Sequence, residues 1–219
     1  MARGRSMVGR ILVGIAVLGV LSVLFMRTLR ETTSAPYLVR SEHLAGWALT
    51  LAPPLGPGGP LLALTPPREL TLDLFNQIFA RTMESMNTPP AYAVTLVLRS
   101  EFSNGLDALV EPGELLDLAR EAGLDNATFQ PRCLAEHRSA DQRGRTFFAL
   151  FDLPELRAFR EQVLGLAAER GADASALDPA AMVPALYLAA TEGGFRGWPV
   201  ADGAAEEHCV APLEVSPDP

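Results

Sequence analysis

Residues 145–155 read RTFFALFDLPE, and this stretch decides the fold that the sequence predicts. Its first seven residues are mostly apolar, which is typical of a strand in the middle of a sheet. The DLPE that follows indicates a helix start, with Asp152 as the N-cap, a proline suited to the first turn and a glutamate three residues after the cap. We therefore expect a central strand over residues 145–151 and a helix from 152 to 170 that stops at Gly171.

Outward from this stretch, three more β-like segments and one more helix complete a repeating order. Residues 92–102, 128–138 and 182–191 indicate strands, and residues 111–124 indicate a helix. The order β-α-β-β-α-β over residues 91–191 predicts a ferredoxin-like domain of the α+β class. Its first and third strands would be central and its second and fourth strands would lie at the edges. Pro131 and Pro184 interrupt the second and fourth strands, which agrees with the tolerance of sheet edges for proline.

The domain is preceded by a connecting region, residues 31–90, and followed by a tail, residues 192–219. Residues 46–51 and 61–65 predict a hairpin around the Pro/Gly loop PPLGPGG. A helix over residues 69–86 follows, and two prolines end it. Its apolar face is expected to pack into the core, with these members: Leu74, Phe75, Ile78, Phe79, Met83 and Met86. The tail is rich in Gly, Pro and acids, so we expect it to be mostly loop.

Residues 11–26 read ILVGIAVLGVLSVLFM and predict a single transmembrane anchor in the lipid bilayer. A short cytoplasmic stub and the anchor together make up residues 1–30. Arg27 and Arg30 follow the apolar run where a signal-peptide cleavage region would be small and neutral, so a retained anchor is favoured over a cleaved signal peptide. More positive charge lies before the run than after it, which predicts a cytoplasmic N-terminus and an extracytoplasmic, periplasmic domain at the cell membrane.

The charge distribution argues against nucleic acid as a partner. The chain has a net charge of −8. Residues 1–30 hold five arginines and no acid, so residues 31–219 carry −13. An acidic domain without a basic stripe repels phosphate backbones. The chain also has no lysine, which excludes Schiff-base and Walker-type lysine chemistry.

Cys133 and Cys209 are the two cysteines of the chain, and we expect a disulfide between them. Two lone cysteines in an oxidising compartment most often pair. The bond would attach the tail to the predicted edge strand. Unpaired thiols are one alternative. A metal site that adds His137 and His208 is another, because these are ligand types for zinc or copper, although the spacing is unlike that of structural sites.

Chemistry-bearing side chains elsewhere form no catalytic pattern. His43, like the other two histidines, does not lie beside a nucleophile motif, and the G-x-S-x-G, H-E-x-x-H and phosphate-loop patterns are missing from the sequence. The acids at Glu111, Glu114 and Asp117 lie at a helix start, where they suit the helix dipole. Glu206 and Glu207 lie in the polar tail. We therefore predict neither catalytic residues nor a cofactor.

The tail contains one candidate interface. Phe195, Arg196 and Trp198 stand among glycines, and these residue types dominate interface hot spots. Equally, the aromatic side chains could pack into the domain itself.

The leading functional hypothesis is a non-catalytic, membrane-anchored accessory or assembly subunit of an envelope membrane complex. An extracytoplasmic ligand-binding or sensory module is the alternative. An enzyme ranks lowest.

Overall fold

The computed structural model describes residues 17–22, 35–52, 58–139, 144–180, 182–191, 195 and 203–216. Contacts divide the chain into two units, Met1–Ala35 and Pro36–Pro219. Residues 17–22 are helical with exposed side chains, and the rest of the predicted anchor, residues 11–26, lies outside the described residues. Among the described residues, no helix has the length and apolar character that a bilayer crossing requires. The anchor therefore stays a prediction.

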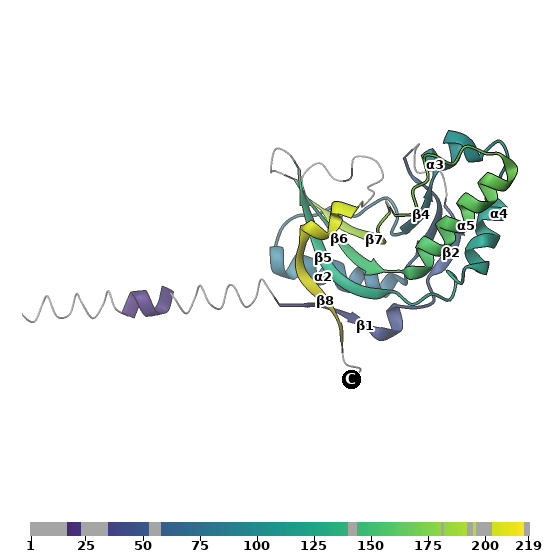
Figure 1. Ribbon diagram of the computed structural model, residues 1–219. Helices are drawn as coiled ribbons and strands as arrows, with labels where there is room; N and C mark the ends of the chain where they lie inside the picture. Colours follow the sequence, from purple (N-terminus) through teal and green to yellow (C-terminus); the bar gives the residue numbers. More distant parts are fainter. Residues whose placement is uncertain are drawn as a thin grey trace, which may run out of the picture. The chain divides into compact units, whose positions relative to one another are not determined.

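In the described residues, the unit Pro36–Pro219 contains eight strands and three helices of ten or more residues (Figure 1). The strands are β1 (Tyr37–Arg40), β2 (Ala48–Leu51), β3 (Pro60–Thr65), β4 (Val94–Leu98), β5 (Gln130–Arg138), β6 (Arg145–Asp152), β7 (Ala185–Ala190) and β8 (Cys209–Ser216). The long helices are α2 (Arg68–Thr82), α4 (Pro112–Glu121) and α5 (Pro154–Arg170). Shorter helical segments are η1 (Ser41–His43), α3 (Arg99–Glu101), η2 (Phe102–Leu106) and η3 (Gly203–His208).

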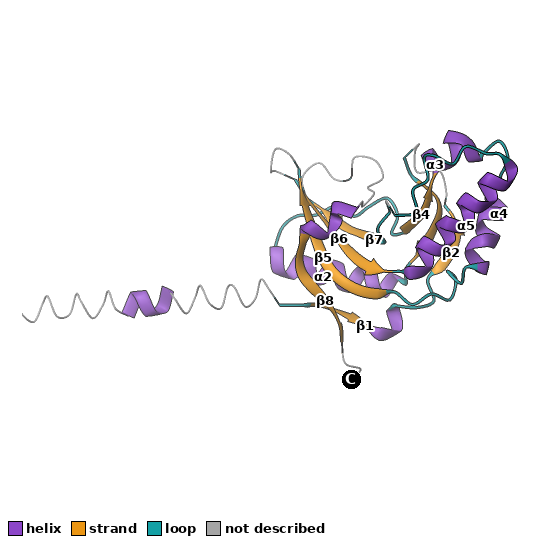
Figure 2. Cartoon of the chain, in the orientation of Figure 1, coloured by secondary structure: helices purple, strands orange, loops and turns teal. Residues whose placement is uncertain are grey.

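The strands form two curled sheets (Figure 2). One has five strands in the order β1-β8-β5-β6-β7, and the other has the order β2-β3-β4. Neighbouring strands are antiparallel except β1 and β8, which are parallel. Helix α2 contacts β1 and β7, the two edge strands of the larger sheet, and so crosses one face of it. Helix α4 packs against α5 and against β2 and β3.

The α+β class is confirmed, and the ferredoxin-like strand order is wrong. That order requires the strand predicted over residues 92–102 to lie beside the strand predicted over 145–151. The first is β4, and it pairs with β3 in the smaller sheet. The second is β6, and its two edges are occupied by β5 and β7. A strand has only two hydrogen-bonding edges, so β6 has none left for β4. The predicted hairpin of β2 and β3 is present.

The proline argument succeeds for one strand and fails for the other. Pro184 directly precedes β7, which is an edge strand as predicted. Pro131 lies in β5, which is an interior strand and not an edge strand. The proline is tolerated because it faces Phe151 at a register shift, and β8 pairs with β5 only from Cys133 onward. A bulge of this kind interrupts the ladder, so no hydrogen bond is lost to the missing N–H.

The tail was predicted to be mostly loop, and this is wrong for its last part. Strand β8 lies between β1 and β5, inside the larger sheet. Ala211 and Leu213 alternate into the core, as the period of two requires. Pro212, which lies between them, interrupts the strand-like pattern of the sequence. Its side chain is exposed, and it is paired in register with Cys133 of β5.

Helix ends differ from prediction at two places. Helix α5 is capped by Gly171 as predicted, and this glycine has a φ of 72°. At the other end of α5, the N-cap is Leu153 without a side-chain hydrogen bond, and not Asp152 as predicted. Helix α2 ends at Thr82, earlier than predicted. Met83 takes the left-handed conformation there, with a φ of 54°.

The main apolar core joins α2, both sheets, α4 and α5. Trp47 stacks on Phe129 within it, with ring centroids 3.7 Å apart. A smaller cluster lies on the other face of the larger sheet, and its buried members are Cys133, Ala135, Phe148, Leu150, Ala185 and Ala205.

Candidate interaction surface

Helix α2 is apolar on two opposite sides. Leu70, Leu74 and Ile78 are buried in the core. Leu72 and Phe79 are 43% and 46% exposed, and Met83, just after the helix, is 76% exposed. At 100° per residue, Leu72 and Phe79 point about 160° and about 140° away from the middle of the buried side. We call Leu72, Phe79 and Met83 the α2 outer stripe.

The predicted core role of Phe79 and Met83 is therefore wrong. Leu74 and Ile78 do pack into the core, and Phe75 and Met86 are partly buried against it. The error arises because a helix with apolar residues on both sides shows the same periodicity whichever side is covered.

The conformation of Met83 is unusual for its residue type. Its φ of 54° lies in the left-handed region, where Met83 is the one described residue other than glycine with positive φ. That conformation costs about 1–2 kcal/mol for an L-residue with a Cβ atom, and glycine is the common choice at such helix ends. A mostly exposed methionine thus occupies a position where glycine would be less strained. Strain retained at an exposed residue is a reason to suspect a function for its side chain.

Polar contacts hold α2 against β1. The Leu38 N–H donates to Gln77 Oε1 at 2.9 Å, and Gln77 Nε2 donates to the Leu38 carbonyl at 2.8 Å. The side-chain amide thereby occupies the free edge of β1, as a further strand would. Arg81 Nη2 donates to the Pro36 carbonyl at 2.6 Å, and its guanidinium lies 3.7 Å from the Tyr37 ring centroid. The end of α2 is therefore fixed to the first residues of the unit.

Charged side chains support this end of α2. Arg145 Nη2 lies 2.6 Å from Glu84 Oε1, which follows Met83 directly, and Arg145 Nη1 lies 3.5 Å from Glu136 Oε2. Burial raises the pKa of Tyr37 above its ordinary value, and the neighbouring Arg81 opposes that rise. The residues that carry the outer stripe are thus well anchored, although the stripe itself is exposed.

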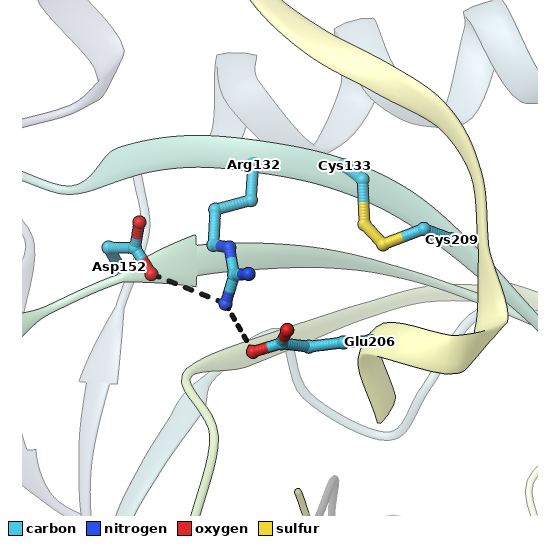
Figure 3. The surroundings of a disulfide bond; sticks show 5 residues. All are labelled: Arg132, Cys133, Asp152, Glu206 and Cys209. Carbon is cyan, nitrogen blue, oxygen red and sulfur yellow. Dashed lines mark hydrogen bonds and ion pairs between the residues drawn. A yellow bond between two sulfur atoms is a disulfide. The ribbon is translucent and has the colours of Figure 1, made fainter. Parts of the chain in front are cut away.

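The opposite face of the larger sheet carries the predicted disulfide. Cys133 of β5 and Cys209 of β8 are bonded, with Cα atoms 5.7 Å apart (Figure 3). Beside the bond, Arg132 Nη1 lies 2.6 Å from Glu206 Oε1 and 3.4 Å from Asp152 Oδ1. The hydrogen bond from Arg132 lowers the pKa of Glu206. The Arg132–Glu206 pair attaches η3 to this face, and the disulfide fixes β8 immediately after η3.

Of the predicted interface residues, only Phe195 belongs to the described part of the chain. Its ring meets the Tyr187 ring edge-on, with centroids 6.4 Å apart. Arg196 and Trp198 lie outside the described residues. The interface at these three residues stays a prediction.

Other candidate groups are engaged in structural contacts. Glu114 pairs with Arg170 at 2.7 Å and accepts the Glu111 backbone N–H, and the arginine holds the pKa of Glu114 at about 2. Asp117 pairs with Arg120 in the same helix. Both cysteines are in the disulfide, so the four-residue metal site weighed from the sequence cannot form. Within the described residues, no three His, Cys, Asp or Glu side chains are grouped to hold a metal ion.

A fully buried arginine was not anticipated from the sequence. Arg160 of α5 donates to the carbonyls of Leu96 and Asp178 and to the carboxylate of Glu101, the last at 2.6 Å. Because protein oxygens occupy its donors, this group serves to join α5 to β4 and α3 and does not offer a ligand site.

Comparison of the chain with protein-family models, with curated proteins and with solved structures finds no match in any of the three. The function must therefore be argued from the chain's own residues.

Proposed function

We propose that the protein is a non-catalytic, membrane-anchored accessory or assembly subunit of an envelope membrane complex. In this proposal the α2 outer stripe binds an apolar surface of a partner membrane protein. The observation that carries the proposal is the exposure of Leu72, Phe79 and Met83 on a helix whose other side already fills the core.

The predicted anchor limits where the partner can be. Residues 27–35 separate the apolar run from Pro36. The ten residue steps from Met26 to Pro36 span at most about 35 Å. The Pro36 carbonyl in turn accepts a hydrogen bond from Arg81, which lies two residues before Met83. An anchor at residues 11–26 would therefore keep the stripe near the bilayer, where membrane proteins are the available partners.

The stripe suits a protein partner better than a lipid surface. Leu72, Phe79 and Met83 follow one line of about 16 Å, which is the anchor pattern of a helix in a protein groove. Helices that lie in a bilayer interface carry a wide apolar face and basic flanks. In α2, Arg68 and Arg81 are balanced by Glu69 and Asp73, so the helix has no net positive charge. Residues 31–219 carry a net −13.

The test is recovery of the complex from native membranes in mild detergent. We expect the full chain to co-purify with an integral membrane protein in fixed stoichiometry. Phe79→Ser should reduce recovery at least tenfold, because a central anchor commonly contributes about 2 kcal/mol or more. Its melting temperature should change by only a few degrees, because the ring is already half exposed.

Leu109→Ser provides the matched control, since Leu109 is 45% exposed but lies outside the stripe. It should leave recovery unchanged. Equal recovery of the two variants, or a chain that leaves the membrane without a stoichiometric partner, would contradict the proposal.

A further inference from the structure

Two histidines distant in sequence lie together beside the disulfide. His137 is near the end of β5, and His208 is the last residue of η3. Their ring centroids are 5.1 Å apart, and the ring planes are nearly perpendicular, at 86°. The sequence analysis placed these two histidines together only in the four-residue metal site, which the disulfide excludes.

The ring nitrogens are available as ligands. His137 is exposed and His208 is half-buried. In the described part of the chain, neither ring takes part in a hydrogen bond or ion pair, and the two rings contact each other. A neutral imidazole with a free lone pair is the commonest side-chain ligand for transition metals. Both rings could therefore turn a nitrogen toward a shared ion without breaking another contact.

The separation of the rings fits chelation. With a metal–nitrogen bond of about 2.0–2.1 Å, each imidazole centroid lies about 3.2 Å from the metal, so tetrahedral geometry places two centroids about 5.3 Å apart. The observed separation is 5.1 Å. Because the rings now meet edge to face, chelation would require the side chains to rotate so that one nitrogen of each ring points at the ion.

The backbone on both sides is held in place. Ala135 of β5 is paired with Cys209 of β8. His137 lies two residues after Ala135, and His208 lies directly before Cys209, so both histidines are next to this paired position. The Cys133–Cys209 bond ties the same two segments covalently, and Arg132 binds Glu206 two residues before His208. Rigid support of this kind reduces the entropy lost when two ligands converge on an ion. The net charge of −8 also favours a cation.

We propose that His137 and His208 form a two-histidine site for a divalent transition ion of the zinc, nickel and copper class. Imidazole nitrogens suit these ions, and water would fill the remaining positions. The site is open, as in metal centres that accept an outside ligand, and not closed like a four-ligand structural site. It does not depend on the proposed accessory function.

The test uses the full chain in detergent, without a polyhistidine tag, titrated with Zn²⁺ by calorimetry. We expect one Zn²⁺ per chain. His137→Asn and His208→Asn should each weaken binding at least tenfold. The double variant should be no more than about twofold weaker than either single variant, because loss of one ligand already ends chelation. Glu207→Gln, which alters an exposed neighbour of His208, should bind Zn²⁺ as the parent chain does.

Several results would overturn the site. Binding that persists in the double variant places the ion elsewhere. Equal affinity of parent and single variants, or no saturable binding up to about 1 mM Zn²⁺, shows that the pair does not chelate. A loss in Glu207→Gln as large as in the histidine variants contradicts a two-histidine site. Because both histidines are at the surface, the melting temperature of each variant should match the parent.

Discussion

The two faces of the five-stranded sheet are covered in different ways. On one face, α2 has fifteen residues and contributes Leu70, Leu74 and Ile78 to the main core. On the other, η3 has six residues, and among the described residues it contributes only Ala205 to the smaller cluster. Apolar burial scales with area, so a long helix can be held by packing, whereas a short helical segment gains little from it. The disulfide and the Arg132–Glu206 pair lie on the face where packing is weaker.

This difference also separates the two proposed sites. A helix held by its inner side can leave its outer side apolar and open to a partner, as α2 does. A segment held by a covalent bond places side chains such as His208 with little apolar burial. The comparison predicts that α2 depends on apolar packing and that η3 depends on the disulfide beside it. Substitutions on either face of the sheet test this prediction.

Removal of the disulfide should have the largest effect. The bond closes 76 residues, and the chain-entropy estimate for such a loop is about 4 kcal/mol. Cys133→Ser/Cys209→Ser should lower the free energy of unfolding by that order, measured by denaturant titration. Because β8 lies inside the sheet, the loss should appear as one cooperative transition. A separate early transition of the C-terminal residues would show that β8 is not integral to the fold.

Truncation on the inner side of α2 should have the next largest effect. Ile78 is fully buried, so Ile78→Ala should cost about 3 kcal/mol and lower the melting temperature by roughly 5–15 °C. Phe79→Ala is the matched control one residue further on, on the exposed side, and should cost less than about 1 kcal/mol. Similar losses for the two variants would contradict the assignment of inner and outer sides.

Local signals in the sequence predicted elements better than their partners. Strand β6 and helix α5 were predicted because RTFFALF and the Gly171 stop are local features. The pairing of β4 with β3, and the place of β8 between β1 and β5, depend on which edges are free after the neighbouring hairpins form. This competition between strands for free edges cannot be predicted from the sequence of any single segment. Within β8, Pro212 also hides the alternation of Ala211 and Leu213.

The same contrast between local signals and long-range pairing holds for the candidate sites. The Cys133–Cys209 bond was predictable because a chain with two cysteines offers one intramolecular pairing. The outer stripe was not, because Phe79 and Ile78 are both apolar residues of one helix, and periodicity alone does not tell which side the sheet covers. The proximity of His137 and His208 is a consequence of the β5–β8 register, which the loop prediction for the tail concealed.

The smallest expected effect is the most informative about the outer stripe. Met83 is strained by its φ of 54° and is mostly exposed, so its side chain contributes little to folding. Met83→Gly removes the strain of the Cβ atom and adds backbone entropy to the unfolded chain. These changes oppose each other, and we expect the free energy of unfolding to rise by up to about 1 kcal/mol.

The same variant should bind the partner less well, because the exposed thioether at the end of the stripe is lost. Differential scanning fluorimetry and recovery of the complex, measured on one preparation, test both effects. Met83→Leu is the control, since it keeps an apolar side chain in the strained position and should preserve recovery without a gain in stability. A glycine variant that is more stable and assembles as well as the parent would leave the strain at Met83 without a functional reason, and would remove the main support for the stripe as a binding surface.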